Sequence, residues 1–145
     1  MLSETKTTLK QLLFQTQGYK RTPYLNQDGV LTVGIGRNLA DRGISLSEAY
    51  IMLENDIDYF DDKLRDLLDF YCRLSPARQA ILIDMCFSLG VIGLLKLKDM
   101  LRCLSEGEYE CASRNMLMSD WAKISNRAQE LAKFMALDMS PTSEA

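Results

Sequence analysis

The chain has 145 residues, of which 47% are hydrophobic and 26% are charged, and its formal net charge is −3. A chain of this length buries about two-thirds of its unfolded surface on folding, so we expect one compact domain that needs no covalent or metal cross-link. It contains no histidine, which excludes imidazole metal ligands and histidine-based acid–base catalysis. No strongly basic patch is visible in the sequence, which argues against a nucleic-acid partner. We therefore expect no metal, no cofactor and no bound nucleic acid.

The cysteines and the N-terminal residues indicate the cellular compartment in which the protein is made. The four cysteines form no C-x-x-C pair and lie within helical patterns, so we expect each to be a small buried residue that stays reduced: Cys72, Cys86, Cys103 and Cys111. The first residues show no charged region followed by an apolar segment, and no stretch approaches the roughly 20 apolar residues of a spanning helix. We expect cytoplasmic synthesis without an export signal, no membrane insertion, and a monomer.

The N-terminal third predicts a helix followed by a hairpin. Residues 3–16 place one apolar face at helical spacing, and Gln17-Gly18 ends this helix. From residue 23 to residue 36, two short β-like runs flank Asn26-Gln27-Asp28-Gly29, which is typical of a hairpin turn. Gly34 and Gly36 indicate a bulge or a close approach of backbone.

The rest of the chain has helical periodicity. Ser45-x-x-Glu48 is a capping box that opens a long helix, whose acidic residues are best interpreted as a solvated face. Ser75-Pro76 begins another helix, whose residues 80–87 are apolar nearly all round and which Gly90 should stop. Shorter helices are expected around residues 94–104, 108–118 and 125–137.

These elements predict a mainly α (α+β) chain with an N-terminal helix, a small β-hairpin unit, a long connecting helix and a C-terminal helical lobe. We expect a single domain over residues 1–139, with the β-containing part at about 17–44 and the helical lobe at about 45–139. Residues 140–145 should form a disordered tail.

The segment from Gln17 to Gly36 resembles the signature of phage-type lysozymes, which are glycoside hydrolases that act on peptidoglycan. The signature reads E-G-x-x-x-x-x-Y-x-D-x-x-G-x-x-T-x-G-x-G, and five positions match at the right spacing: Tyr24, Gly29, Thr32, Gly34 and Gly36. Arg37-Asn38-Leu39 is a common continuation, and Phe87-Ser88-Leu89-Gly90 and Trp121 to Ala128 resemble later family phrases. The resemblance implies a lysozyme-like fold over nearly the whole chain.

The two catalytic carboxylates of the family are replaced by amides in this sequence. The resemblance places the general acid at Gln17 and the second carboxylate at Asn26, with Thr32 as the third catalytic-site position. Cleavage of a β-1,4 glycosidic bond needs one acid to protonate the leaving oxygen and a second carboxylate to activate water or stabilise the transition state. An amide does neither, so we expect an inactive or severely impaired enzyme. Asp28, Glu4 or Asp41 could replace a carboxylate, but Asp28 is better explained by the turn.

The resemblance also implies substrate contacts at Asn38, Phe87 and Asn115. Each has a structural alternative: Phe87 as a packing residue, and the two asparagines as solvated positions. Arg37 is expected to pair with a nearby acid and hold the hairpin in place.

Three interpretations remain open. The chain is a pseudoenzyme that still faces a peptidoglycan-like glycan, a protein-interaction module (an effector or regulator) on the same scaffold, or an active endolysin whose two carboxylates were replaced deliberately. Ser88, Met100 and a shortened segment after Trp121 also depart from the family, which favours natural decay over engineering. Phage relatives leave the cytoplasm through a pore made by a second protein, and a dedicated secretion system is the alternative route.

Overall fold

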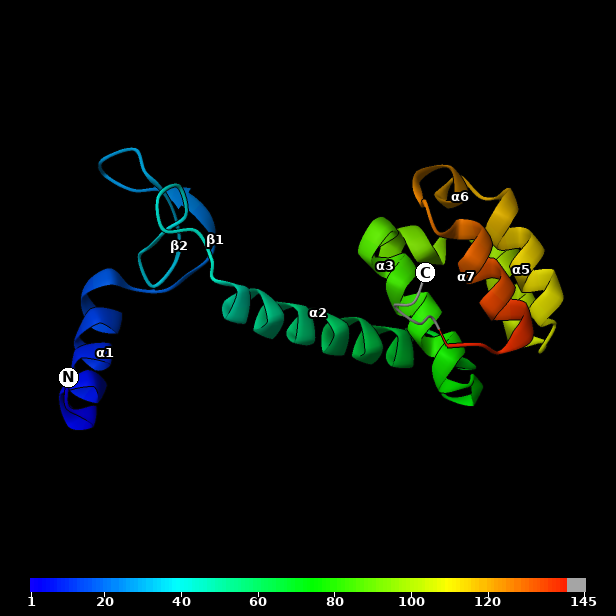
Figure 1. Cartoon of the computed structure of the whole chain (residues 1–145), viewed down its shortest axis with the longest axis horizontal. Helices are drawn as coiled ribbons and strands as arrows, with labels where there is room; N and C mark the ends of the chain where they lie inside the picture. Colours follow the sequence, from blue (N-terminus) through cyan, green and yellow to red (C-terminus); the bar gives the residue numbers. More distant parts are fainter. Residues whose placement is uncertain (141–145) are drawn as a thin grey trace. The chain divides into compact units, whose positions relative to one another are not determined.

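The computed structural model describes residues 1–140, which form a mainly helical chain with one small antiparallel sheet (Figure 1). The elements in chain order are α1 (Ser3–Gln17), β1 (Lys20–Leu25), β2 (Leu31–Gly34), β3 (Arg37–Asn38), α2 (Leu46–Leu67), η1 (Tyr71–Arg73), α3 (Pro76–Leu95), α4 (Lys98–Ser105), α5 (Tyr109–Met118), α6 (Trp121–Ile124) and α7 (Ala128–Leu137). The expected mainly α class with a small β unit is confirmed.

The chain divides into two compact units, Met1–Met52 and the residues from Leu53 onward. Each unit is described by itself, and the expectation that they form a single domain stays a prediction. The expected disordered tail, residues 140–145, lies outside the described residues apart from Ser140.

In the first unit, the predicted helix and hairpin are both present. α1 ends at Gln17 because Gly18 adopts φ +71°, and the Gly18 N–H donates to the Phe14 carbonyl at 3.0 Å. β1 and β2 pair antiparallel, with Tyr24 opposite Thr32, and β3 adds a third strand on β2.

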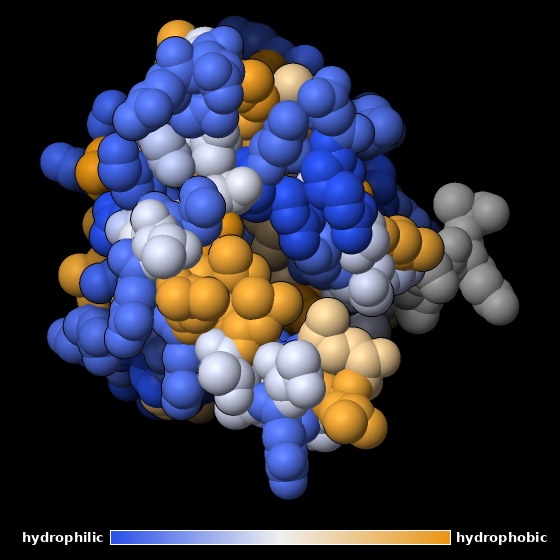
Figure 2. Space-filling view, turned by 90° about the vertical axis from the view of Figure 1, so that its left-hand side faces the viewer, coloured by the Kyte–Doolittle hydropathy of each residue, from blue (hydrophilic) through white to orange (hydrophobic). Residues whose placement is uncertain are grey.

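This first unit buries few side chains. Thr32 is the only residue of Met1–Met52 that is fully buried, with 3% of its surface exposed. The apolar face predicted for α1 is exposed, as at Leu12 and Leu13. Figure 2 shows a hydrophobic area within a face that is otherwise largely hydrophilic. Backbone pairing and polar contacts therefore contribute most of the order within this unit.

The second unit has an apolar core built around α3. Ile81, Leu82, Met85 and Cys86 of this helix are buried, as predicted, and α5 packs beside α4 and α7 around them. Gly90 (φ +68°) breaks the helical path as expected, but a further helical segment continues to Leu95, so the next helix begins only at Lys98.

α3 also corrects the expectation that no apolar stretch approaches spanning length. Among the described residues it is the one helix long and apolar enough to cross a membrane by composition. Six of its side chains are buried, including the charged Arg78, and its path is broken at Gly90. These features are those of a core helix.

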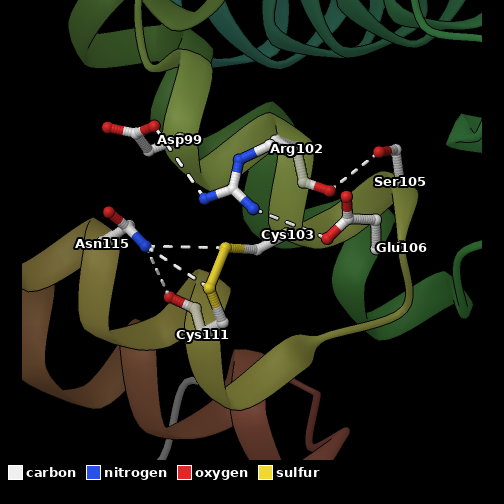
Figure 3. Close-up of a disulfide and its surroundings, with 7 residues drawn as sticks. All are labelled: Asp99, Arg102, Cys103, Ser105, Glu106, Cys111 and Asn115. Carbon is white, nitrogen blue, oxygen red and sulfur yellow. Dashed lines mark hydrogen bonds and ion pairs between the residues drawn. A yellow bond between two sulfur atoms is a disulfide. The ribbon is translucent and has the colours of Figure 1, made fainter.

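The expectation of four reduced cysteines is wrong for one pair. Cys103 in α4 and Cys111 in α5 form a disulfide, with Cα atoms 5.7 Å apart (Figure 3). The two helices are joined by a tight turn in which Gly107 adopts φ +76°, and this turn brings residues eight positions apart together. Cys72 is an exposed free thiol and Cys86 a buried one.

Arg78 links the start of α3 to the end of α7. Its Nε donates to the Met135 carbonyl at 2.8 Å and its Nη2 to the Ala136 carbonyl at 3.3 Å, while the guanidinium lies 3.5 Å from the ring centroid of Tyr109. The last carbonyls of a helix have no partner within the helix, so this cation satisfies two of them and opposes the helix dipole.

Replacing this arginine should therefore destabilise the second unit. We expect Arg78→Met to lower the free energy of unfolding by about 3 kcal/mol, because two carbonyls lose their donor in a buried place. Urea denaturation followed by circular dichroism measures the change. The matched control is Arg114→Met on the exposed face of α5, which should change stability by less than about 0.5 kcal/mol. Equal effects of the two variants would contradict this role.

Candidate functional site

One pocket of the first unit brings together the two amide positions. It has a volume of about 460 Å³ and lies between the end of α1 and the hairpin turn, with seven lining residues: Gln17, Lys20, Tyr24, Leu25, Asn26, Gln27 and Asp28. Lys20 holds its ammonium 4.0 Å from the ring centroid of Tyr24. The pocket contains one carboxylate, Asp28, and one cation, so its formal charge is balanced.

Gln17 reaches this pocket from the last turn of α1. Its side chain lies against the backbone of Gly36, where a Cβ would come within 2.9 Å of the Gln17 Oε1. Gly36 also adopts φ +72°, which glycine tolerates best. Of the two alternatives predicted at Gly34 and Gly36, the structure has the close approach of backbone, in the turn from β2 to β3, and this turn leaves room for the side chain of residue 17.

The side chain of Asn26 stabilises the hairpin turn. Its Oδ1 accepts hydrogen bonds from the backbone N–H groups of Asp28 and Val30, each at 2.9 Å. An aspartate at this position would accept the same two bonds, because the contact uses only the oxygen. The amide therefore keeps the turn and removes the charge.

Thr32 and Asn38 do not line this pocket. The Thr32 hydroxyl is buried and donates to the Val30 carbonyl at 2.8 Å. Asn38 lies opposite Thr32 on β3, and its side chain bonds Asp41 through both its amide nitrogen and its oxygen. Asn38 lines a separate pocket of about 700 Å³ that also contains Arg37 and Glu48.

Phe87 and Asn115 belong to the second unit and line different pockets. Phe87 is 47% exposed and packs edge-on against Phe60, with ring centroids 5.1 Å apart, beside a groove of about 430 Å³. Asn115 lines a pocket of about 280 Å³ and donates from Nδ2 to the Cys111 carbonyl at 3.0 Å. Figure 3 shows this amide turned toward the disulfide.

Sequence reasoning missed Asp84, a half-buried acid in the groove beside Phe87. The signal was present, because Asp84 is the one charged residue in the apolar run of residues 80–87. Burial raises the pKa of its carboxyl, and Arg127 opposes this effect only from 4.0 Å. Within residues 1–140 no group of three or more cysteine and acidic side chains is placed to hold a metal ion.

Arg37 forms the predicted ion pair, and its partner is Glu48 of the capping box. Nη1 donates to Glu48 Oε2 at 3.0 Å and to the Gly43 carbonyl at 2.9 Å, and Nη2 contacts Glu48 Oε1. The Ser45 N–H adds a bond of 2.7 Å to the same carboxylate. Arg37, followed by Ser45, holds the pKa of the Glu48 carboxyl well below its usual range.

A comparison with protein families adds an independent finding. The family model described as Phage lysozyme matches residues 15–134, a span that includes the pocket of Gln17 and Asn26 and the groove beside Phe87. No curated protein sequence matches the chain.

The low pKa of Glu48 predicts how the first unit responds to acid. A carboxyl whose pKa is lower folded than unfolded contributes stability above its unfolded value, near 4.3, and loses that contribution as the pH falls toward the folded value. Hydrogen exchange of the β1–β2 amides should therefore speed up on acidification below about pH 4, after correction for the intrinsic exchange rate. Glu48→Gln should show weaker protection at neutral pH and a smaller pH dependence. Glu54→Gln, on an exposed turn of α2, is the control and should behave like the unchanged chain.

Proposed function

Because the chain belongs to the phage lysozyme family, we propose that it binds peptidoglycan or a related β-1,4-linked glycan and hydrolyses it very slowly or not at all. One observation carries this proposal. The two side chains that line the pocket at the positions of the family's catalytic acids, Gln17 and Asn26, are both amides.

Neither amide can replace a carboxylate in this chemistry. Gln17 has no proton to give to a leaving oxygen, and loss of a positioned general acid alone lowers the rate by about 10²–10⁴-fold. Asn26 carries no negative charge to stabilise an oxocarbenium-like transition state, and its oxygen already accepts two backbone bonds. The two losses compound each other.

Asp28 is the only carboxylate among the residues that line this pocket. Hydrolysis by this route needs two carboxyl groups in different protonation states, and one group cannot fill both roles.

Binding places fewer demands on these residues than catalysis does. Glutamine and asparagine still donate and accept hydrogen bonds, and sugar hydroxyl groups need both. The side chain of Gln17 lies against the backbone of Gly36, and Asn26 is held by the hydrogen bonds of its turn, so both side chains line the same pocket. A glycan-binding pseudoenzyme therefore fits the pocket better than an active hydrolase does.

The chain should sediment with purified peptidoglycan without lysing it. We expect the turbidity of a peptidoglycan suspension to stay constant. Hydrolysis needs one residue as general acid and a second as a charged carboxylate, and no two pocket residues can fill these roles. Absence of sedimentation would favour the protein-interaction module instead. Robust lysis that Asp28→Asn abolishes would show that Asp28 has taken over catalysis.

Restoring the carboxylates should recover only part of the activity. We expect Gln17→Glu/Asn26→Asp to stay at least about tenfold below a typical active relative, because Ser88 and the shortened segment after Trp121 place the sugar less tightly, and a misplacement of about 1 Å can cost on the order of 10²-fold. The single variants, Gln17→Glu and Asn26→Asp, are the matched controls and should remain near background. Full recovery by the double variant would identify the two amides as the only departures that matter, as engineered substitutions would be.

A further inference from the structure

The disulfide of the second unit joins a buried residue to a partly exposed one. Cys103 lies in the last turn of α4 with none of its surface exposed. Cys111 lies in the first turn of α5 and packs at the rim of the apolar core. Cys111 is therefore the residue at which a thiol from solution reaches the disulfide.

Asn115 connects this disulfide to a pocket. Its Nδ2 donates to the Cys111 carbonyl at 3.0 Å and lies 3.5 Å from Cys103 Sγ and 3.6 Å from Cys111 Sγ. Among residues 1–140, these two cysteines supply all the side-chain hydrogen bonds of Asn115 (Figure 3). Asn115 also lines the pocket of about 280 Å³ between the start of α4 and the end of α5. The disulfide thus fixes the orientation of a pocket side chain.

Reduction of the disulfide displaces the acceptors of Asn115. A covalent S–S bond is shorter than the van der Waals contact between two thiols, so the two sulfurs must separate when the bond opens. The core encloses Cys103, and the displacement therefore falls on Cys111 and on the first turn of α5. The carbonyl and the sulfur of Cys111 move together, and the amide of Asn115 loses its fixed position.

The rest of the second unit does not depend on this bond. The two cysteines are only eight positions apart, so the disulfide restricts the unfolded chain less than the closure of a long loop would. Met100 and Leu104 anchor α4 in the core, and Ala112 and Met116 anchor α5. We therefore expect reduction to loosen the junction of α4 and α5 and to leave the core folded.

We propose that Cys103 and Cys111 form a redox switch that sets the position of Asn115 and thereby controls ligand binding in its pocket. The oxidised form is the binding form. This control of binding rests on the glycan-binding function proposed above, whereas the effect of the bond on α5 does not.

Thiol–disulfide exchange with a small thiol such as glutathione operates the switch. A glutathione thiolate attacks the Cys111 sulfur, forms a mixed disulfide and releases Cys103 as a thiolate, which takes up a proton. A second glutathione thiolate attacks the glutathione sulfur of the mixed disulfide and releases glutathione disulfide and the Cys111 thiolate, which is protonated in turn. The cysteine pair gains two electrons and two protons, and two glutathione molecules lose them.

Thiol trapping and hydrogen exchange on the full chain test the switch. In glutathione buffers of increasing reduced fraction, without denaturant, the free thiols of Cys103 and Cys111 should appear together and disappear when glutathione disulfide is restored. Alkylation after an acid quench, followed by mass spectrometry, measures them. Exchange of the amides of residues 112–115 should be at least about tenfold faster in the reduced chain, while the amides of α3 and α7 keep their protection.

Two variants define the response. Cys111→Ala cannot form the bond, so it should exchange like the reduced chain in both buffers. Cys72→Ser alters an exposed free thiol outside the pair, and as the matched control it should switch like the unchanged chain.

Sedimentation with peptidoglycan is the second readout. The oxidised chain should bind about fivefold more tightly than the reduced chain, which is the order of one net hydrogen bond. Cys111→Ala should bind like the reduced chain in both buffers, and Cys72→Ser should follow the unchanged chain.

Four results would overturn the proposal, each in a defined way. If glutathione leaves the pair oxidised, or opens it only as the whole second unit unfolds, the disulfide is a structural cross-link. If residues 112–115 exchange equally in both states, the bond does not position Asn115. If both states sediment equally, binding is not under redox control and the proposed function stands. If neither state sediments, the proposed function fails together with the control of binding, and hydrogen exchange alone decides whether the bond orders α5.

Discussion

The contact between Arg37, Glu48 and Ser45 holds the candidate site in place. The unit that contains the pocket of Gln17 and Asn26 buries only one of its side chains fully, so hydrophobic burial contributes little to its order. Arg37 joins the third strand to the Gly43 carbonyl and to the first turn of α2, and Ser45 closes the capping box on the same carboxylate. One carboxylate thus fixes both the start of a helix and the edge of the sheet.

The second unit is stabilised differently. Its apolar core surrounds α3. Among the polar groups that enter this core, Arg78 completes hydrogen bonds at the end of α7, while the buried Nε1 of Trp121 has no hydrogen-bond partner among the described residues. A similar contact anchors η1, where the Tyr71 hydroxyl donates to Asp61 at 2.7 Å and Arg65 bonds the other oxygen. These bonds lower the pKa of the Asp61 carboxyl.

Amides in place of two carboxylates, as we propose for Gln17 and Asn26, change little in the local structure of the pocket. Asn26 accepts the two backbone bonds that an aspartate would accept, and Gln17 fills the space over Gly36 that a glutamate of equal size would fill. An isosteric amide removes charge and acidity without creating a cavity, so stability alone does not select against it. The proposed loss of catalysis is therefore compatible with an unchanged scaffold.

The sequence by itself determined the features that depend on neighbouring residues. The Ser45–Glu48 capping box, the turn at Asn26 to Gly29 and the end of α1 at Gly18 all follow from contacts within a few positions, and the structure has each of them. The family signature, equally local, is the basis for the proposal that Gln17 and Asn26 stand at the catalytic positions. Such features can be predicted from the sequence because a helix cap or a turn is complete within one segment.

The tertiary structure decided what depends on residues far apart or on burial. It paired Cys103 with Cys111 through the turn at Gly107, and it buried the Thr32 hydroxyl as a donor to the Val30 carbonyl. It also placed Phe87 and Asn115 in different pockets. It likewise placed the half-buried carboxyl of Asp84 in a mostly apolar groove beside Phe87. Packing of distant segments sets the solvation and the partners of each polar group, and these in turn set its chemistry.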